Sequence, residues 1–87
     1  MVRNKEAQLL GGMIFNNDAI PGVISKGSPS FRSPANQKVF DAIVSLHQAG
    51  QPIDLVTLRD ELVRRAHLDD VGGPDYLIGL IEGIESL

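Results

Sequence analysis

The chain has 87 residues and a formal net charge of −3, from eight Lys and Arg against eleven Asp and Glu. A chain of this length forms one domain with a small core, and its acidic balance disfavours binding to nucleic-acid phosphates. Because it has no cysteine and no apolar run near the roughly 18 residues of a membrane span, disulfides, thiolate metal sites and a transmembrane segment are excluded, and we expect a cytoplasmic protein.

A first helix is expected over residues 4 to about 16. Its apolar side consists of Leu9, Leu10, Met13 and Ile14. Gly11 and Gly12 lie in its middle, and since an interior glycine costs about 1 kcal/mol relative to alanine, we expect a neighbouring helix to approach closely there. A phosphate-binding loop is the alternative, but no nucleotide-binding glycine pattern is present. Residues 16–18 then break the helix and cap a short second one over residues 19 to about 25.

The centre of the chain predicts two capped helices joined by a tight turn. Ser33 and Pro34 suit the start of the first helix, Gly50 and Pro52 its stop, and Asp54 the cap of the second. The apolar side of the first helix is Val39, Phe40, Ile43, Val44 and Leu46. That of the second is Leu55, Val56, Leu58, Leu62, Val63 and Ala66. We expect these two helices to form the scaffold of the domain.

Such a pair of helices allows two interpretations. One is an αα-hairpin whose apolar sides build a core, and the other is a helix-turn-helix that reads DNA with Arg59, Arg64 and Arg65. Three acidic residues in the same segment largely balance those arginines, which weakens the second interpretation. We favour the hairpin and keep a small DNA-binding domain as the alternative.

The last helix is expected to begin at Pro74 or Asp75, after a connection over residues 68–74. Its apolar side is Tyr76, Leu77, Leu80, Ile81 and Ile84, while Ile78 points elsewhere. Gly79 and Gly83 make a flat strip beside that side, and such glycines favour close packing against the same domain or a second copy. We favour a contact between copies and expect an interface that involves Phe15, Ile78, Gly79 and Gly83.

No residue pattern indicates catalysis. His47 and His67 are twenty residues apart, without a third ligand motif, so they form a weak zinc signal. For His47, a half-buried ring at the end of its helix is the favoured interpretation and a metal ligand the alternative. We assign no catalytic, cofactor-binding or metal-binding residue, and we expect the domain to have no enzymatic activity and no cofactor.

Four stretches together carry a resemblance to a known family. They are residues 9–14 (LLGGMI), 31–43 (FRSPANQKVFDAI), 47–62 (HQAGQPIDLVTLRDEL) and 71–77 (VGGPDYL). In this order they resemble the N-terminal domain of DnaB-type replicative helicases over nearly the whole chain. Asn36 stands where that family often has histidine. The resemblance implies an all-α fold, a small globular bundle of about five helices, which pairs with copies of itself.

The resemblance also implies a role in DNA replication. In the parent helicase such heads form a collar above the motor ring and offer a docking surface to primase and sometimes to a loader. The Walker A pattern of an ATPase is absent here, so ATP and Mg²⁺ would belong to a separate motor domain. We expect residues 1–87 to be a domain cut from a larger helicase, without its helical hairpin and motor. Its partners are then a second copy (a homodimer), primase and a loader, and it meets DNA only through the parent protein.

Overall fold

The computed structural model describes residues 5–25 and 31–85, and within these the side chains of residues 8–25 and 31–81. The helices are α1 (Lys5–Phe15), a 3-10 turn η1 (Asn17–Ala19), α2 (Ile20–Ser25), α3 (Pro34–Gln48), α4 (Leu55–Arg64), α5 (Leu68–Val71) and α6 (Gly73–Glu85). No residue in the described part of the chain is in a strand. The expected all-α fold is confirmed, and the described residues form six α-helices where about five were expected.

The additional helix is α5, in the stretch that was expected to be a connection. It is a single turn, with Asp69 and Asp70 near its amino end, where the helix dipole favours negative charge. Gly72 ends it with φ of 103°, in the left-handed region. Val71 is only 3% exposed. The turn therefore brings one more apolar side chain into the core, and a four-residue helix is too short to show a periodic pattern in the sequence.

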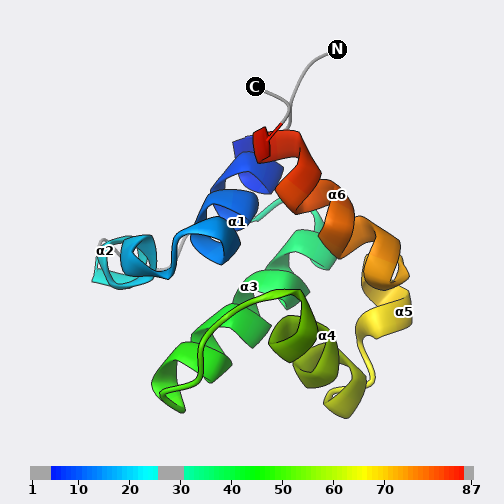
Figure 1. Cartoon of the computed structure of the whole chain (residues 1–87). Helices are drawn as coiled ribbons and strands as arrows, with labels where there is room; N and C mark the ends of the chain where they lie inside the picture. Colours follow the sequence, from blue (N-terminus) through cyan, green and yellow to red (C-terminus); the bar gives the residue numbers. More distant parts are fainter. Residues whose placement is uncertain (1–4, 26–30, 86–87) are drawn as a thin grey trace.

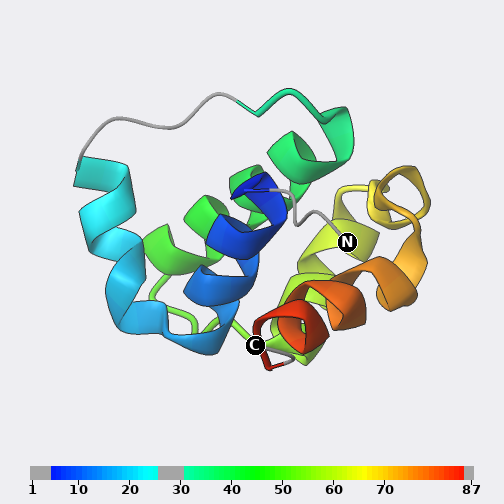
Figure 2. The same ribbon diagram turned by 90° about the horizontal axis from the view of Figure 1, so that it is seen from above.

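Four of the helices close around the core. α1 packs against both α3 and α6, and α4 also packs against both α3 and α6, so the four form a ring (Figure 1). The short α2 contacts η1 and lies to one side of the ring, as the view from above shows (Figure 2). The last helix, α6, thus packs against the first, α1, and this contact between elements far apart in the sequence closes the domain.

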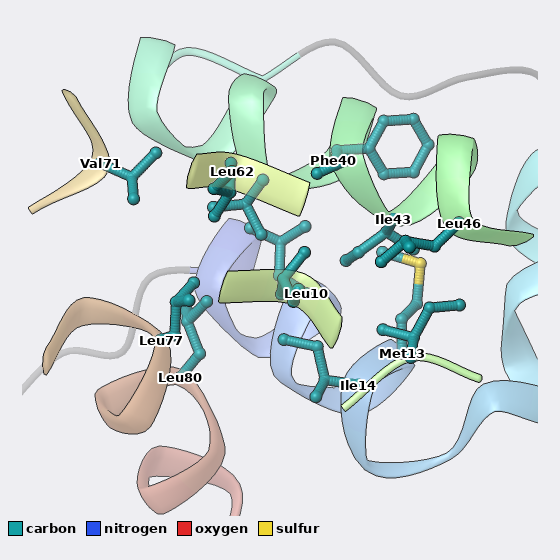
Figure 3. Packing of buried hydrophobic residues seen from close by; sticks show 14 of the residues in the cluster. Leu10, Met13, Ile14, Phe40, Ile43, Leu46, Leu62, Val71, Leu77 and Leu80 are labelled. Atoms are coloured by element: carbon teal, nitrogen blue, oxygen red, sulfur yellow. The ribbon is translucent and has the colours of Figure 1, made fainter. Parts of the chain in front are cut away.

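The core is aliphatic and centres on α1. Leu10 is fully buried and lies in the middle of the cluster in Figure 3, with Leu62 of α4 and Leu77 and Leu80 of α6 around it. On the other side, the side chain of Met13 extends toward α3. The buried apolar residues of α3 are Val39, Phe40, Ala42, Ile43 and Leu46. The apolar sides predicted for α1, α3 and α6 are therefore the ones that pack inside, apart from Ile84, which lies outside the described side chains.

Side chains cap the first turns of α3 and α4, as predicted. The Ser33 hydroxyl accepts from the Asn36 N–H (3.3 Å), and the Asp54 carboxylate accepts from the Thr57 N–H (2.9 Å). Thr57 returns a bond by accepting the Asp54 N–H (2.9 Å), which completes a capping box. Gly50 has φ of 74° and ends α3 in a Schellman motif.

The apolar side predicted for α4 is only half right. Leu58 and Leu62 are fully buried, but Val56 and Val63 are 60% and 57% exposed. At about 100° per residue, the two valines lie roughly 140–160° around the helix from Leu58, so they cannot share its face. Ala66 lies beyond the helix end, with φ of 61°, and is exposed. The surface of α4 therefore carries two large apolar side chains.

Close helix packing was predicted at Gly11 and Gly12; for Gly12 the prediction is wrong, and for Gly11 it stays a prediction. A Cβ atom at Gly12 would meet nothing within 4 Å, and the same holds for Gly79. Gly11 is buried beside it. Nothing among the described residues explains the glycine at position 12.

One amide side chain joins the end of α1 to the turn between α3 and α4. The Asn17 Nδ2 group donates to the carbonyls of Met13 (3.1 Å), Ile14 (3.2 Å) and Ile53 (3.0 Å). Its Oδ1 atom accepts from the Ile53 N–H (2.8 Å). The amide thus pairs with both backbone groups of Ile53, as a neighbouring strand would, and also satisfies free carbonyls at the end of α1. We call this arrangement the Asn17 clamp.

A buried carboxylate holds the last turn of α4. Glu61 is 7% exposed and accepts from Arg64 Nη2 (2.7 Å) and from Arg65 Nε (2.8 Å). Hydrogen bonds from Arg64 and then Arg65 lower the pKa of Glu61 from 4.5 to about 2, while its burial acts in the opposite direction. Glu61 is therefore ionised at neutral pH, and its charge is compensated.

A further polar pair links α3 to α6. Asn36 is only 1% exposed, and its side-chain oxygen accepts from the Tyr76 hydroxyl. The departure from the family pattern at Asn36 therefore falls in the interior, not on the surface.

A surface ion pair between Lys38 and Asp70 (3.2 Å) joins α3 to α5.

We predict that Asn17→Ala lowers the free energy of unfolding by about 2–3 kcal/mol, because it leaves both backbone groups of Ile53 without their partner. Urea denaturation followed by circular dichroism measures this. Asn16→Ala is the matched control, since the Asn16 side chain makes one exposed bond, to the Asp18 N–H (3.2 Å). Equal effects of the two substitutions would contradict the clamp.

We predict that Glu61→Gln lowers the free energy of unfolding by about 1–3 kcal/mol at pH 7. The folded-state pKa of about 2 lies below the ordinary value of 4.5, so the stabilisation is complete above pH 4.5 and is lost as the pH falls toward 2. The difference between the wild type and the variant should therefore shrink over that range in urea titrations. Asp60→Asn, at an exposed surface pair, serves as control and should show almost no such pH dependence.

Candidate protein-interaction surface

Among the side chains that the structure describes, four large apolar ones lie exposed on α1, α4 and α6. Phe15 is 64% exposed, Val56 60%, Val63 57% and Ile78 40%. A single exposed apolar residue is ordinary on a protein surface, whereas a continuous apolar patch is typical of an interface. The question is therefore whether these four side chains form one continuous apolar patch, as an interface would require.

Two hollows connect three of them. The larger, about 360 Å³, is lined by Ile14, Phe15, Asp54, Leu55, Val56 and Ile81. The smaller, about 150 Å³, is lined by Leu55, Val56, Arg59, Pro74, Leu77 and Ile78. Because Leu55 and Val56 line both, the hollows lie on either side of the first turn of α4. We call this continuous apolar surface the α4 groove.

The cap and the clamp position the groove. The capping box at Asp54 fixes the first turn of α4, where Leu55 and Val56 lie. The Asn17 clamp bonds Ile53, the residue before that cap, to the end of α1, where Phe15 lies. On the far side, α6 packs against both α1 and α4. The three helices that form the groove, α1, α4 and α6, are therefore held together by the hydrogen bonds of Asn17 and by apolar packing in the core.

The structure places the predicted interface residues as follows. Phe15 lines the larger hollow and Ile78 the smaller, so both belong to the α4 groove. Gly79 is exposed next to Ile78, with open space where a side chain would be. Gly83 lies in α6, but its surroundings fall outside the described residues. Whether any of the four contacts another molecule stays a prediction.

Sequence reasoning missed Val56, which separates the two hollows. It was assigned to the buried side of α4 because it is apolar and lies near Leu55 and Leu58. The seven-residue spacing of Val56 and Val63 places both on a second face, opposite Leu58, and this signal was available in the sequence. What the sequence could not show is that Val56 lies between α1 and α6 whereas Val63 does not.

Charged groups lie at both hollows of the groove. Asp54 lines the larger hollow and Arg59 the smaller. Arg59 Nη2 contacts Asp60 (3.2 Å), an exposed pair. The other two arginines proposed for DNA reading, Arg64 and Arg65, both bond to Glu61. Each of the three is thus already next to a carboxylate, an arrangement unlike an open basic surface.

The described residues contain no group of three or more His, Asp or Glu side chains that could hold a metal ion. His47 lines a separate hollow beside the turn that follows α3. His67 lies before α5, and its Nδ1 atom is buried without a hydrogen-bond partner. The two histidines are thus not part of a metal cluster there. In the same part of the chain, no helix is both long and apolar enough to cross a membrane.

Comparison with known proteins gives consistent matches. The chain is 44% identical over 80 residues to "Replicative DNA helicase DnaB" of Mycobacterium leprae (strain TN), covering 91% of this chain and 13% of that protein. It is 39% identical over 74 residues to the protein of the same name from Leifsonia xyli subsp. xyli (strain CTCB07), covering 83% of this chain and 16% of that protein. The chain thus spans less than a fifth of these relatives.

A solved structure agrees with these matches. The crystal structure of the N-terminal domain of DnaB helicase from Mycobacterium tuberculosis has a TM-score of 0.84 and 45% identity, covering 88% of this chain and 56% of that one. The model of the family described as "DnaB-like helicase N terminal domain" matches residues 2–87. Because this match takes in nearly every residue, the chain belongs to the family of DnaB-like helicase N-terminal domains.

Proposed function

We propose that the chain is a non-catalytic protein-interaction and oligomerisation module of a replicative DNA helicase. In this role it helps to form the N-terminal collar of the helicase and docks primase, and in some systems a loader, within the cytoplasmic replication machinery. Residues 1–87 then form one head domain of a longer protein, whose ATPase motor and helical hairpin lie elsewhere. DNA is bound and unwound by that longer protein.

The observation that carries this proposal is the α4 groove on a chain of this family. Its lining is largely apolar, and Phe15 and Val56 project beside it with more than half of their surface exposed. Exposing large apolar side chains to water is unfavourable, so a continuous patch of them favours burial against another protein. The carboxylate in its lining, Asp54, accepts from the Thr57 N–H as the cap of α4.

DNA reading by α4 is the weaker function. The arginines that would contact phosphates are near Asp60 and Glu61, and the chain as a whole carries a net negative charge. Fluorescence anisotropy with labelled duplex DNA at about 50 mM salt tests it. Binding that weakens steeply with salt would favour the DNA-binding domain, and we expect none.

Self-association is the first test of the proposed function. We expect the wild-type chain to be a dimer by light scattering at high concentration, and Phe15→Ser to raise the dissociation constant at least about tenfold, because a central aromatic contact is lost. Val63→Ser is the matched control, since Val63 is similarly exposed but does not line the groove. A strictly monomeric wild type would contradict the oligomerisation half of the proposal.

Primase docking is tested in the intact helicase. Deletion of residues 1–87 from the parent protein should abolish recruitment of primase, measured as co-elution of the purified proteins in gel filtration. Adding the isolated chain in excess should compete with the intact helicase for primase. If the shortened helicase still recruited primase as well as the full protein, the docking half would be wrong.

A further inference from the structure

The hollow beside the end of α3 shares no lining residue with the α4 groove. Its volume is about 480 Å³, and it lies where the turn after α3, residues 50–53, meets η1 and the start of α2. We call it the η1 hollow. Pro21, Gly50, Gln51 and Pro52 line it and are exposed, so it is open at the surface, where a macromolecule can reach it.

The η1 hollow attracts positive charge. Asp18 lines it and is exposed, and no ion pair or hydrogen bond with the described residues occupies its carboxylate. The carboxyl end of α3 lies at the same hollow, where the helix dipole adds partial negative charge. The described residues that line the hollow include no Lys or Arg. A cationic group from another molecule would therefore compensate the negative charge there.

The hydrogen-bond acceptors of the η1 hollow favour a guanidinium group. Besides the two carboxylate oxygens of Asp18, they include the side-chain oxygen of Gln51 and, in a neutral imidazole, one nitrogen of His47. Acceptors on three side chains suit the five N–H donors of a planar guanidinium better than a compact ammonium group. Pro21 and Pro52 add apolar surface on which the aliphatic stem of an arginine can pack.

The η1 hollow is held in shape by the fold. The Asn17 clamp bonds both backbone groups of Ile53, and Asn17 and Ile53 both line the hollow. The Pro52 carbonyl accepts from the Thr57 hydroxyl (2.9 Å), and Gly50 ends α3 in a fixed turn. A preformed site loses less conformational entropy when a partner binds.

We propose that the η1 hollow binds an arginine side chain presented by a partner protein, with the Asp18 carboxylate as its counter-ion and Pro21 and Pro52 against its stem. This inference goes beyond the proposed function, because it adds a docking face separate from the α4 groove and names the chemistry of its partner. It rests on that function only in taking the partner to be a protein. Free arginine suits the hollow less well, since it brings its own carboxylate toward a negative surface.

A short peptide with one arginine tests this inference. We expect acetyl-Gly-Arg-Gly-amide, titrated into the isotope-labelled chain at about 50 mM salt, to shift the backbone amide signals around the hollow in a saturable way. Two-dimensional NMR measures the shifts, which should be largest at Asn17, Asp18, Gly50, Gln51 and Ile53. The same peptide with citrulline keeps the shape without the charge, and its dissociation constant should be at least about threefold higher. A lysine peptide should also bind more weakly than the arginine peptide.

Substitutions separate the site from general attraction to an acidic protein. Asp18→Asn should raise the dissociation constant of the arginine peptide at least about threefold, because it removes the counter-ion. Gln51→Ala, which removes an exposed acceptor, should raise it by a smaller factor. Asp69→Asn is the matched control, since Asp69 is exposed but does not line the hollow, and should leave it unchanged. The amide spectrum of each variant checks that it is folded.

The outcomes distinguish this inference from the proposed function. Equal binding of the citrulline peptide, an equal effect of Asp69→Asn, or shifts that do not saturate would overturn the arginine site. Tighter binding of spermidine than of the arginine peptide at the same residues would assign the hollow to a free polyamine, and the protein partner would be wrong. Dimerisation and primase recruitment are measured without these peptides, so failure of the arginine site would leave the proposed function standing.

Discussion

The arrangement of this domain depends on a single side-chain amide. Asn17 begins η1, two residues after the end of α1, and its bonds to Ile53, thirty-six residues later, join α1 to the turn before α4. The four bonds replace those that the end of a helix and a turn would otherwise make with water. Without them, α1 and α4 would be related only through their packing against α3 and α6. The amide therefore sets the orientation at which the ring of helices closes.

Other polar groups have similar roles at the edges of the aliphatic core. The Tyr76 hydroxyl of α6 donates a hydrogen bond to the buried Asn36 of α3. At the end of α4, Glu61 accepts hydrogen bonds from Arg64 and Arg65. A small domain buries little apolar surface, and Leu, Ile and Val side chains can pack in several registers at similar cost. A buried polar group finds its hydrogen-bond partner in only one of these packing registers. In the others it would be left unpaired, at a cost of about 1–3 kcal/mol. The Tyr76–Asn36 bond thus favours one packing of α3 against α6, whereas the Glu61 pairs stabilise the last turn of α4 itself.

The candidate interaction surface is a consequence of the same closure. Once α1 and α6 are fixed beside the first turn of α4, the apolar side chains that remain outside the core lie next to one another and form a groove. Val63, equally apolar but two turns further along α4, lines neither hollow. Burial of that groove against another protein is the role that fits both its composition and the family of the chain.

The sequence by itself determined the helices, because capping residues, helix-breaking Gly and Pro, and apolar spacing act locally: Ser33, Gly50 and Asp54 mark the ends that the structure has. It also carried the family resemblance. Tertiary structure alone decided that Asn17 is a clamp, that α5 turns Val71 inward, and that Val56 lies between two hollows. The reason is physical, since each depends on contacts between residues far apart in the chain, whereas spacing along one helix states only which side chains share a face.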